Sequence, residues 1–517
     1  MKNCGGCVRI IKTLLSGGRM KKEWFFDRFC GEQLVAYAED GVLKEAAIEN
    51  EAEGDELGNI YKGRVQNVVE GMQAAFIDCG MERNCYLPLH ERAAILASYD
   101  GDKSEVAGAP LKEGDEVLVQ VVKPARGSKG AKVTRDLSFV GKSLIYLPCS
   151  RFLGISRKLT DPDLREALLK ETGKLIDGDE GYIIRTAAKD ATGRRLKTEA
   201  EYLKRIYRLT LETAASSPVG ACVYKEYDLP LKIMRDSLGS DLTRIYVGDR
   251  ELYERVLRLA KIRPDIGGKK VEFYTGERQL FTKFGLSEQI LNLTTPRAEL
   301  ENGGYLVIER TEAMTVIDVN TGSFTGKDDL ETTVYETNLL AAREIARLVR
   351  LRNIGGIVAV DFIDMQDEGH RLAVEEELTR AMADDKAKTR VFPMNELCVT
   401  LFTRKRTRND LLSFLLKECP HCTHGGYVLS DIFMEMRIRA AIMDCFADGF
   451  NAVLIELNRD LFNKILREGV FSQELNGRWK GKRIYAVPHT TWHEEKFTVQ
   501  GDNSKVLTLP DNAQLLY

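Results

Sequence analysis

The sequence has no apolar run long enough to span a membrane, and its net charge is small. The most apolar stretch near its start, residues 7–15, is interrupted by Arg9 and Lys12 and makes a poor signal peptide. The formal charge of −3 neither favours nor excludes a nucleic-acid partner, because basic residues can still be clustered. We therefore expect a protein with no membrane span.

Cysteine is sparse and scattered, with 11 in 517 residues. The exceptions to single spacing are two Cys-x-x-Cys pairs, at residues 4–7 and 419–422. Scattered thiols in a long chain without an export signal fit a reducing compartment, so the predicted location is cytoplasmic. The first pair lies in residues 1–19, before the second methionine, Met20. We expect that segment to be a disordered extension and its cysteine pair to be accidental.

Two aspartates follow what read as neighbouring buried strands. Asp318 lies in segment 314–322 and Asp361 in segment 354–365, and both segments are apolar and β-branched. A helical stretch at about 329–352 separates them, which predicts a right-handed crossover with parallel strands roughly 5 Å apart. Both carboxylates then emerge where open α/β sheets bind ligands, and they repel unless a proton or cation joins them. We expect a hard cation such as Mg²⁺, with phosphate chemistry.

Short strands with glycine turns between about residues 58 and 123 predict a small closed barrel of the OB type. Phe76 and Tyr86 fall within it, beside the basic residues Lys62 and Arg64. Aromatic side chains among basic ones on a barrel face suit stacking on single-stranded bases. The same spacing also fits plain core residues.

Three further basic segments are candidates for phosphate contacts. They are the glycine-flanked loop 125–131, the pair Arg185 and Thr186 at a strand end, and the run 403–408. An arginine can donate two hydrogen bonds to a phosphate, and a basic run beside an acidic metal site suits the backbone of a polyanion. The alternative in each case is an ordinary solvated loop or face.

The second cysteine pair, Cys419-Pro-His-Cys422, has the spacing of a metal knuckle. Zinc prefers four tetrahedral ligands, and this pair supplies two thiolates. Either His421 or His424 completes the set, or a second subunit does. A zinc site shared between two subunits predicts a zinc-linked homodimer. The alternative is a pair of reduced cysteines that binds no metal.

Short motifs run in one order from about Met20 to the second cysteine pair. They are Asn59-Ile-Tyr-Lys-Gly, Ala74-Ala-Phe-Ile-Asp, Leu87-Pro-Leu, Gly154-Ile-Ser-Arg, Ile184-Arg-Thr-Ala, Tyr274-Thr-Gly, Ile317-Asp-Val-Asn-Thr-Gly, Leu351-Arg-Asn-Ile-Gly-Gly, Val360-Asp-Phe-Ile-Asp-Met, Thr403-Arg-Lys-Arg-Thr-Arg and Cys419-Pro-x-Cys. With these motifs the sequence resembles the ribonuclease E/G family of endoribonucleases, closest to the shorter ribonuclease G type.

The resemblance implies a multidomain α/β and α+β architecture. Its expected parts are an RNase H-like fold split over 20–53 and 230–293, an inserted S1 (OB) barrel at 54–135, a 5′-sensor domain at 136–229, a DNase I-like catalytic domain at 294–415, a zinc link at 416–430 and a small dimerisation domain at 431–517. Members of the family assemble as dimers or dimers of dimers, so a homodimer or homotetramer is expected.

The resemblance also implies roles for residues at matching positions. Asp318, Asp361 and Asn320 match the catalytic residues, the two aspartates as magnesium ligands, and Cys419 and Cys422 match zinc ligands shared between subunits. Residues assigned to RNA contacts, by match or by charge, are Phe76, Tyr86, Lys62, Lys129, Arg404 and Arg406. Residues assigned to the sensor of a 5′-monophosphate are Arg185, Thr186 and Lys388.

The implied activity is Mg²⁺-dependent hydrolysis of single-stranded, AU-rich RNA to 5′-phosphate and 3′-hydroxyl ends, in rRNA or tRNA processing or in mRNA decay. One competing interpretation is a catalytically inactive RNA-binding scaffold, and the intact Asp318, Asn320 and Asp361 argue against it. Another is a metal phosphodiesterase that acts on DNA, and the expected S1 barrel argues against that.

Overall fold

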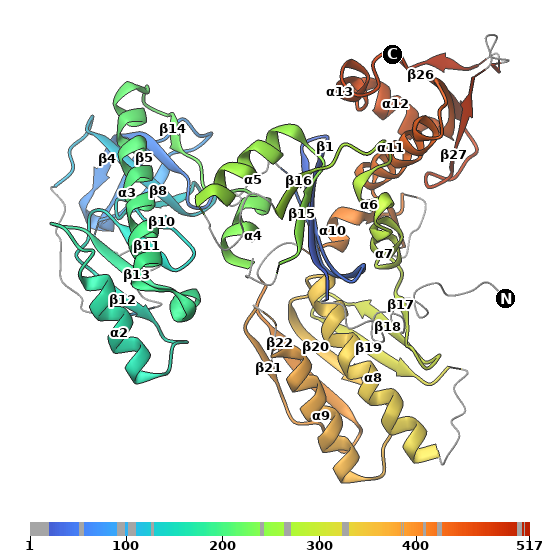
Figure 1. Ribbon diagram of the computed structural model, residues 1–517, viewed down its shortest axis with the longest axis horizontal. Coiled ribbons are helices and arrows are strands. Elements are labelled where there is room, and N and C mark those ends of the chain that lie inside the picture. The colour runs from blue at the N-terminus through green and yellow to red at the C-terminus, as the bar shows by residue number, and fades with distance from the viewer. Residues whose placement is uncertain are drawn as a thin grey trace. The chain divides into compact units, whose positions relative to one another are not determined.

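The computed structural model of the protein describes residues 20–50, 56–89, 99–101, 110–125, 129–237, 242–262, 270–322, 330–383, 385, 387–406, 410–420, 426–503, 509–510 and 512–516. The chain forms two compact units. The first unit holds residues 1–50, 241–257 and 267–517, and the second unit holds residues 51–240 and 258–266. Both units combine helices with sheets, which confirms the predicted mixed α/β, multidomain class (Figure 1). Within the described ranges, no helix has the length and hydropathy that crossing a membrane requires.

The first unit begins with a five-stranded sheet. Its order is β16 (Val271–Phe273), β15 (Arg244–Val247), β1 (Lys22–Phe29), β2 (Glu32–Glu39) and β3 (Val42–Asn50), and α6 (Leu280–Lys283) and α7 (Leu286–Asn292) follow in the chain. The turns Cys30-Gly31 and Asp40-Gly41 have positive φ at both residues. Such turns match the twist of the flanking strands, and glycine takes the second position without a steric cost. The local sequence thus specifies the two hairpins.

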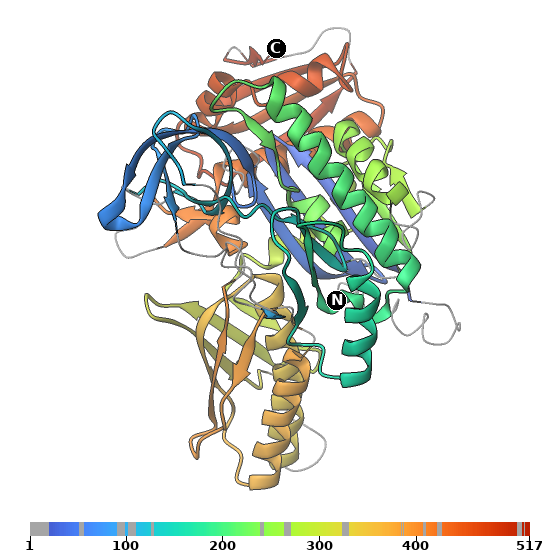
Figure 2. The same ribbon diagram turned by 90° about the vertical axis from the view of Figure 1, so that its left-hand side faces the viewer.

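The first unit also contains the sheet that carries the two predicted catalytic aspartates. Its order is β17 (Arg297–Glu299), β18 (Tyr305–Arg310), β19 (Met314–Asn320), β20 (Gly356–Asp361), β22 (Val399–Arg404) and β21 (Thr389–Val391). The helices α8 (Leu330–Leu351) and α9 (Glu368–Met382) cover one face, and Figure 2 shows the sheet and helices as two layers. The predicted strand, helix, strand crossover is confirmed, with parallel pairing of β19 and β20.

The last part of the first unit is a short hairpin followed by a second α/β layer. The hairpin pairs β23 (Leu416–Glu418) with β24 (Tyr427–Leu429), after α10 (Leu412–Leu415). The sheet has the order β27 (Phe497–Asp502), β25 (Ala452–Asn458), β26 (Arg483–His489) and β28 (Gln514–Leu515), and the helices are α11 (Asp431–Ala447), α12 (Arg459–Glu468) and α13 (Ser472–Asn476).

The second unit contains the predicted barrel. Its strands are β4 (Ile60–Val69), β5 (Ala74–Asp78), β6 (Cys85–Pro88), β9 (Lys132–Thr134) and β8 (Glu116–Lys123), and pairing of β8 with β4 closes the ring. A Cβ at Gly63 would lie 2.4 Å from Ile77, so close packing of β4 on β5 requires glycine there. The prediction of a small closed barrel of the OB type is confirmed.

The rest of the second unit is a second sheet with flanking helices. The sheet order is β10 (Phe139–Val140), β11 (Leu144–Leu147), β13 (Gly181–Ile184), β12 (Leu153–Ser156) and β7 (Tyr99–Gly101). The remaining elements are β14 (Cys222–Tyr224), which pairs with β4, the helices α2 (Pro162–Gly173), α3 (Gly193–Ser216) and α4 (Leu229–Ser237), and the 3₁₀ turns η1 (Glu70–Met72) and η3 (Thr186–Asp190). The helix α5 (Arg250–Ile262) begins in the first unit, and its last residues belong to the second.

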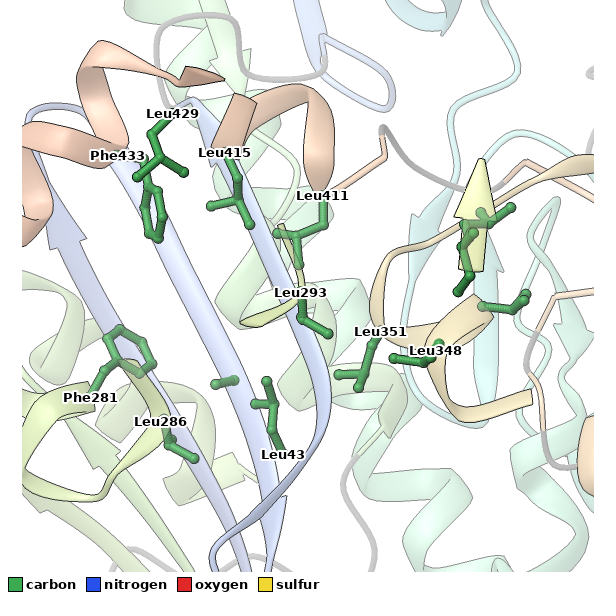
Figure 3. Packing of buried hydrophobic residues seen from close by; sticks show 14 of the residues in the cluster. Leu43, Phe281, Leu286, Leu293, Leu348, Leu351, Leu411, Leu415, Leu429 and Phe433 are labelled. Atoms are coloured by element: carbon green, nitrogen blue, oxygen red, sulfur yellow. The ribbon is translucent and has the colours of Figure 1, made fainter. Parts of the chain in front are cut away.

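A large cluster of buried hydrophobic side chains runs through the first unit (Figure 3). It joins Leu43 of β3, Leu348 and Leu351 of α8, Leu415 of α10 and Phe433 of α11. Each fully buried side chain of this size stabilises the fold by about 1.5–3 kcal/mol. The N-terminal sheet, the aspartate-bearing sheet and the C-terminal layer are therefore parts of one core.

Glu435 of α11 makes the stability of this core depend on pH. Its side chain is 2% exposed, and Lys464 Nζ is 3.7 Å away. Burial outweighs the attraction of Lys464 and raises the pKa of Glu435 to about 7. The folded protein then holds this proton more tightly than the unfolded chain does, so the contribution is fully present below the usual pKa and is lost as pH rises through about 7. We expect a loss of roughly 3 kcal/mol between pH 4.5 and 8.

Replacement of this carboxyl by an amide tests the assignment. Glu435→Gln is expected to flatten the dependence of unfolding free energy on pH across that range and to raise stability at pH 8. Urea unfolding at several pH values measures both effects, and Glu336→Gln, an exposed position on α8, is the matched control. An unchanged pH slope in Glu435→Gln would contradict the assignment.

Candidate active site

Alternation along two parallel strands places the predicted catalytic residues on the open face of the sheet. In β19, Thr315, Ile317 and Val319 are buried, whereas Asp318 is exposed. The period of two along a strand sends these two sets to opposite faces. In β20, Asp361 is likewise exposed. The covered face packs on α8 and α9, so the carboxylates lie on the face that the helices leave free.

Asp318 and Asp361 are direct partners in the register of the parallel pair. Neighbouring strands lie about 4.8 Å apart, which is the separation that the sequence predicts for the two aspartates. Asn320 Nδ2 donates a hydrogen bond of 2.8 Å to Asp318 Oδ2 and so orients that carboxylate. The three residues of the predicted catalytic set are thereby brought together.

The charge of this pair is suited to a cation. Among the described residues, neither Asp318 nor Asp361 forms an ion pair, and no group of three or more histidine, cysteine or acidic residues is arranged to bind a metal. Two adjacent unpaired carboxylates repel each other and gain from a shared cation. Mg²⁺ often uses one or two protein carboxylates and takes its other ligands from water and phosphate oxygens. The residues present therefore fit magnesium.

Asn338, which was not predicted from the sequence, fixes the loop that follows Asp361. It is completely buried in α8, and its Nδ2 donates to the Ile363 carbonyl oxygen at 2.8 Å. The Ile363 N–H donates back to Asn338 Oδ1 at 3.1 Å. A signal was present in the sequence, because Asn338 interrupts the apolar stripe of α8 between Val334 and Ala342, and a buried amide needs partners.

Replacement of Asn338 by leucine is expected to leave both Ile363 backbone groups without a partner. The cost is about 1–3 kcal/mol of stability for each unpaired group. Displacement of Asp361 should also lower the cleavage rate by about ten- to a hundredfold. Thermal unfolding and single-turnover cleavage measure the two losses, with the exposed Asn292→Ala as control. A variant that loses stability but retains the full rate would show that the loop does not position Asp361.

The barrel presents Phe76 and Tyr86 on its outer face. They are register partners on β5 and β6, and their rings meet edge to face at 6.1 Å. Both are half-buried, while Ile77 and Leu87, their neighbours in sequence, are buried. Lys129 is exposed, and it precedes the short segment whose Ala131 accepts a hydrogen bond from Tyr86 N. This arrangement leaves aromatic faces accessible for stacking.

Lys62 has acidic and carbonyl partners within the second unit. Its Nζ lies 3.1 Å from a Glu116 carboxylate oxygen and donates to the Ser217 carbonyl oxygen at 3.1 Å. Arg64 contacts the same carboxylate at 3.0 Å. The hydrogen bonds from Arg64 and Lys62 lower the pKa of Glu116. A phosphate would have to compete with Glu116 for Lys62.

Two of the predicted sensor residues, Arg185 and Thr186, directly follow β13, which pairs in parallel with β12. Thr186 Oγ1 is 2.9 Å from Ser156 Oγ, and the Arg185 guanidinium contacts Asp236 at 2.7 Å. Burial raises the pKa of Asp236, but the neighbouring Arg185 and Arg235 outweigh it and the net shift is downward. Ser156 and Asp236 were not predicted. Lys388, also assigned to the sensor, is exposed in the first unit, where its carbonyl accepts from Lys405 N.

Arg404 was predicted to contact RNA from the surface, but its side chain is buried. Its side chain is 5% exposed and contacts Asp385 at 2.7 Å, and it also donates to Asn353 Oδ1 and to the Ile354 carbonyl. Strand alternation sends Arg404 to the covered face of the sheet, so its guanidinium is already engaged. Arg404 is therefore left out of the candidate RNA contacts, whereas Arg406 is exposed and stays among them.

Cys419 lies directly after β23, and its N–H donates to Gly426 O across the hairpin. Cys422, His421 and His424 lie outside the described residues, as do the pair at residues 4–7. The zinc knuckle thus remains a prediction from the sequence.

Comparison with known proteins finds relatives in a single family. The model of the ribonuclease E/G family matches residues 138–407. The chain is 37% identical over 403 residues to ribonuclease G of Haemophilus influenzae, which is 77% of this chain and 82% of that protein. Ribonuclease G of Escherichia coli K12 is 37% identical over 402 residues, with the same two shares. Ribonuclease E of Escherichia coli K12 is 33% identical over 414 residues, which is 79% of this chain and 39% of that protein.

Proposed function

The chain belongs to the ribonuclease E/G family of endoribonucleases, and we propose that it cleaves single-stranded, AU-rich RNA in a magnesium-dependent hydrolysis. The products would carry 5′-phosphate and 3′-hydroxyl ends. The observation that carries the proposal is the direct register of Asp318 with Asp361 on the open face of the sheet. Processing of rRNA or tRNA and decay of mRNA, in the cytoplasm, are the proposed settings.

In this proposal Asp318 and Asp361 hold the cation between adjacent strands, and Asn320 keeps the Asp318 carboxylate in place. Bound Mg²⁺ would supply an activated water and charge compensation for the reacting phosphate. Asn338 holds the backbone just beyond Asp361, so the second carboxylate is presented in a fixed direction. Such positioning reduces the reorganisation that the reaction requires.

The barrel would hold the RNA strand through its accessible aromatic rings. Phe76 and Tyr86 can stack on bases, because every base offers a π face, and stacking contributes about 1–3 kcal/mol per base. Exposed Lys129 and Arg406 would contact phosphates. Arg185 and Thr186 would bind a 5′-monophosphate, and the phosphate would displace Asp236 from Arg185.

The assembly is proposed to be a homodimer or homotetramer in which Cys419 and Cys422 share a zinc ion with a second subunit. Support comes from the spacing of the pair and from the hydrogen bond that Cys419 N–H donates to Gly426 O next to the β23–β24 pairing. Metal analysis together with mass measurement in solution, before and after chelation, tests both parts.

The function itself is tested with a substrate panel. A 5′-monophosphorylated, AU-rich single-stranded RNA should be cut with Mg²⁺ and left intact with chelator, while a matched duplex RNA and a matched DNA should resist cleavage. A 2′-deoxy substitution at the cleaved nucleotide should still permit cutting, since hydrolysis does not use the 2′-hydroxyl. Binding of RNA without any cleavage would favour the scaffold, and equal cutting of DNA would favour a general phosphodiesterase.

A further inference from the structure

The open face of the aspartate-bearing sheet has a second feature, an exposed apolar surface beside the carboxylates. Met314 is 37% exposed, Ile357 is 45% exposed and Leu401 is 44% exposed. Val316 and Ala359 are half-buried on the same face. We call these five residues the apolar floor. Large exposed apolar patches with a polar rim mark interaction or ligand-binding sites on soluble proteins.

The strand register places the apolar floor in two rows next to the catalytic pair. In the first row Val316, Ala359 and Leu401 are partners across β19, β20 and β22. In the second row Met314 is the partner of Ile357. The first row is two residues from Asp318 and Asp361 along the strands, about 7 Å away, and lies on the same face. If a ligand is bound at the two carboxylates, the neighbouring groups of that ligand therefore lie over the apolar floor.

Basic and aromatic groups border the apolar floor at one edge of the sheet. The Phe392 N–H donates to the Leu401 carbonyl at 2.9 Å, so Phe392 continues the first row. The guanidinium of Arg390 lies over the Phe392 ring, 4.7 Å from its centroid. Arg390 and Lys405 are both exposed. On the opposite side the exposed Glu309 is the partner of Val316, so the cations border the floor along the β21 side. An apolar surface with cations along one side fits a chain that combines flat, weakly polar bases with phosphates.

We propose that the apolar floor binds one or two unpaired bases of the substrate RNA next to the scissile phosphate. This inference rests on the proposed function and adds to it a second base-binding surface besides the barrel. A protein partner is the weaker candidate, because a partner large enough to bury the floor would also cover Asp318 and Asp361. A base-paired strand would present its backbone rather than free base faces, so the floor selects single strands at the point of cleavage.

The test compares Ile357→Thr/Leu401→Thr with wild type on an RNA that has one cleavage site. Each protein is given the intact RNA and RNAs with a single abasic nucleotide on either side of the site, under single-turnover conditions. Wild type should lose about tenfold in rate when the base over the floor is removed. The floor variant should lose about tenfold on intact RNA and nothing further on the abasic RNA.

Threonine preserves strand propensity, and thermal unfolding verifies that the floor variant is folded. Leu372→Gln, which removes an exposed leucine from α9, is the matched control and should behave as wild type. The inference is overturned if the floor variant discriminates between intact and abasic RNA as strongly as wild type does. Wild type that cuts no RNA at all would overturn the proposed function instead, so the two failures are distinguishable.

Discussion

Replacement of Asp361 by asparagine is expected to lower the rate of RNA cleavage by about a thousandfold. The amide has nearly the same size but no charge, so it removes half of the carboxylate pair that faces Asp318 in register. A bound cation contributes several kcal/mol of charge stabilisation at the transition state, and each 1.36 kcal/mol corresponds to about tenfold in rate. Single-turnover cleavage of the AU-rich RNA, with Mg²⁺ titrated over a wide range, measures the loss.

Asp364 offers a matched control for this variant. It is an exposed aspartate three residues further along, beyond the end of β20, so Asp364→Asn removes the same charge from the same neighbourhood. It should change the rate by less than about threefold, as expected for an exposed charge. Asp361→Asn that cuts RNA at the wild-type rate would contradict the metal assignment. Equal losses of rate in both variants would show that any negative charge in this neighbourhood has the same effect, without a specific metal ligand.

Replacement of Asp385 by leucine is expected to destabilise the first unit by about 3–5 kcal/mol, because it leaves the buried Arg404 charge without its partner. The side chains are 2% and 5% exposed. The double variant Asp385→Leu/Arg404→Met removes both charges and should recover much of the loss. Chemical unfolding of the two variants measures their difference in unfolding free energy. Fluorescence and circular dichroism should give the same unfolding midpoint.

Two outcomes would contradict this interpretation of Arg404. The first is a loss of less than about 1 kcal/mol in the single variant, which is the loss expected for an exposed ion pair. Alternatively, a double variant that is stable but binds RNA much more weakly than wild type would restore Arg404 to the RNA contacts. Arg406→Gln, at an exposed position two residues on, shows what loss of a surface cation does to RNA affinity in the same segment.

The sequence was most informative where local pattern and long-range pairing agree. Apolar β-branched segments on either side of a helical stretch predict the parallel strands β19 and β20, and the residue that ends each pattern is the aspartate of the pair. The barrel was predicted for a similar reason, because short strands between glycine turns allow few other folds. In both cases the distance between functional groups follows from strand geometry alone.

The burial of Arg404 was not predicted, for a physical reason. A run of basic residues is normally solvated or binds a polyanion, but residues 403–404 still belong to β22, and alternation turns Arg404 inward. Its partner Asp385 is 19 residues away in sequence, and no local pattern relates the two. Asn338 was missed because its partner Ile363 is 25 residues away in sequence, so the interrupted apolar stripe does not by itself reveal what the amide binds. Asp236 was missed because its role depends on how α4 packs near Arg185.

The division of the first unit between distant parts of the chain has a consequence for synthesis on the ribosome. Strand β1 pairs in parallel with β15, so a strand made among the first thirty residues waits for one made after residue 240. The second unit is almost continuous in between and has its own buried clusters. Domains generally fold as units while the chain emerges. We therefore expect the nascent chain to complete the barrel before β1 can pair with β15. Until then the unpaired edge of β1 stays exposed, and we expect chaperones to protect it.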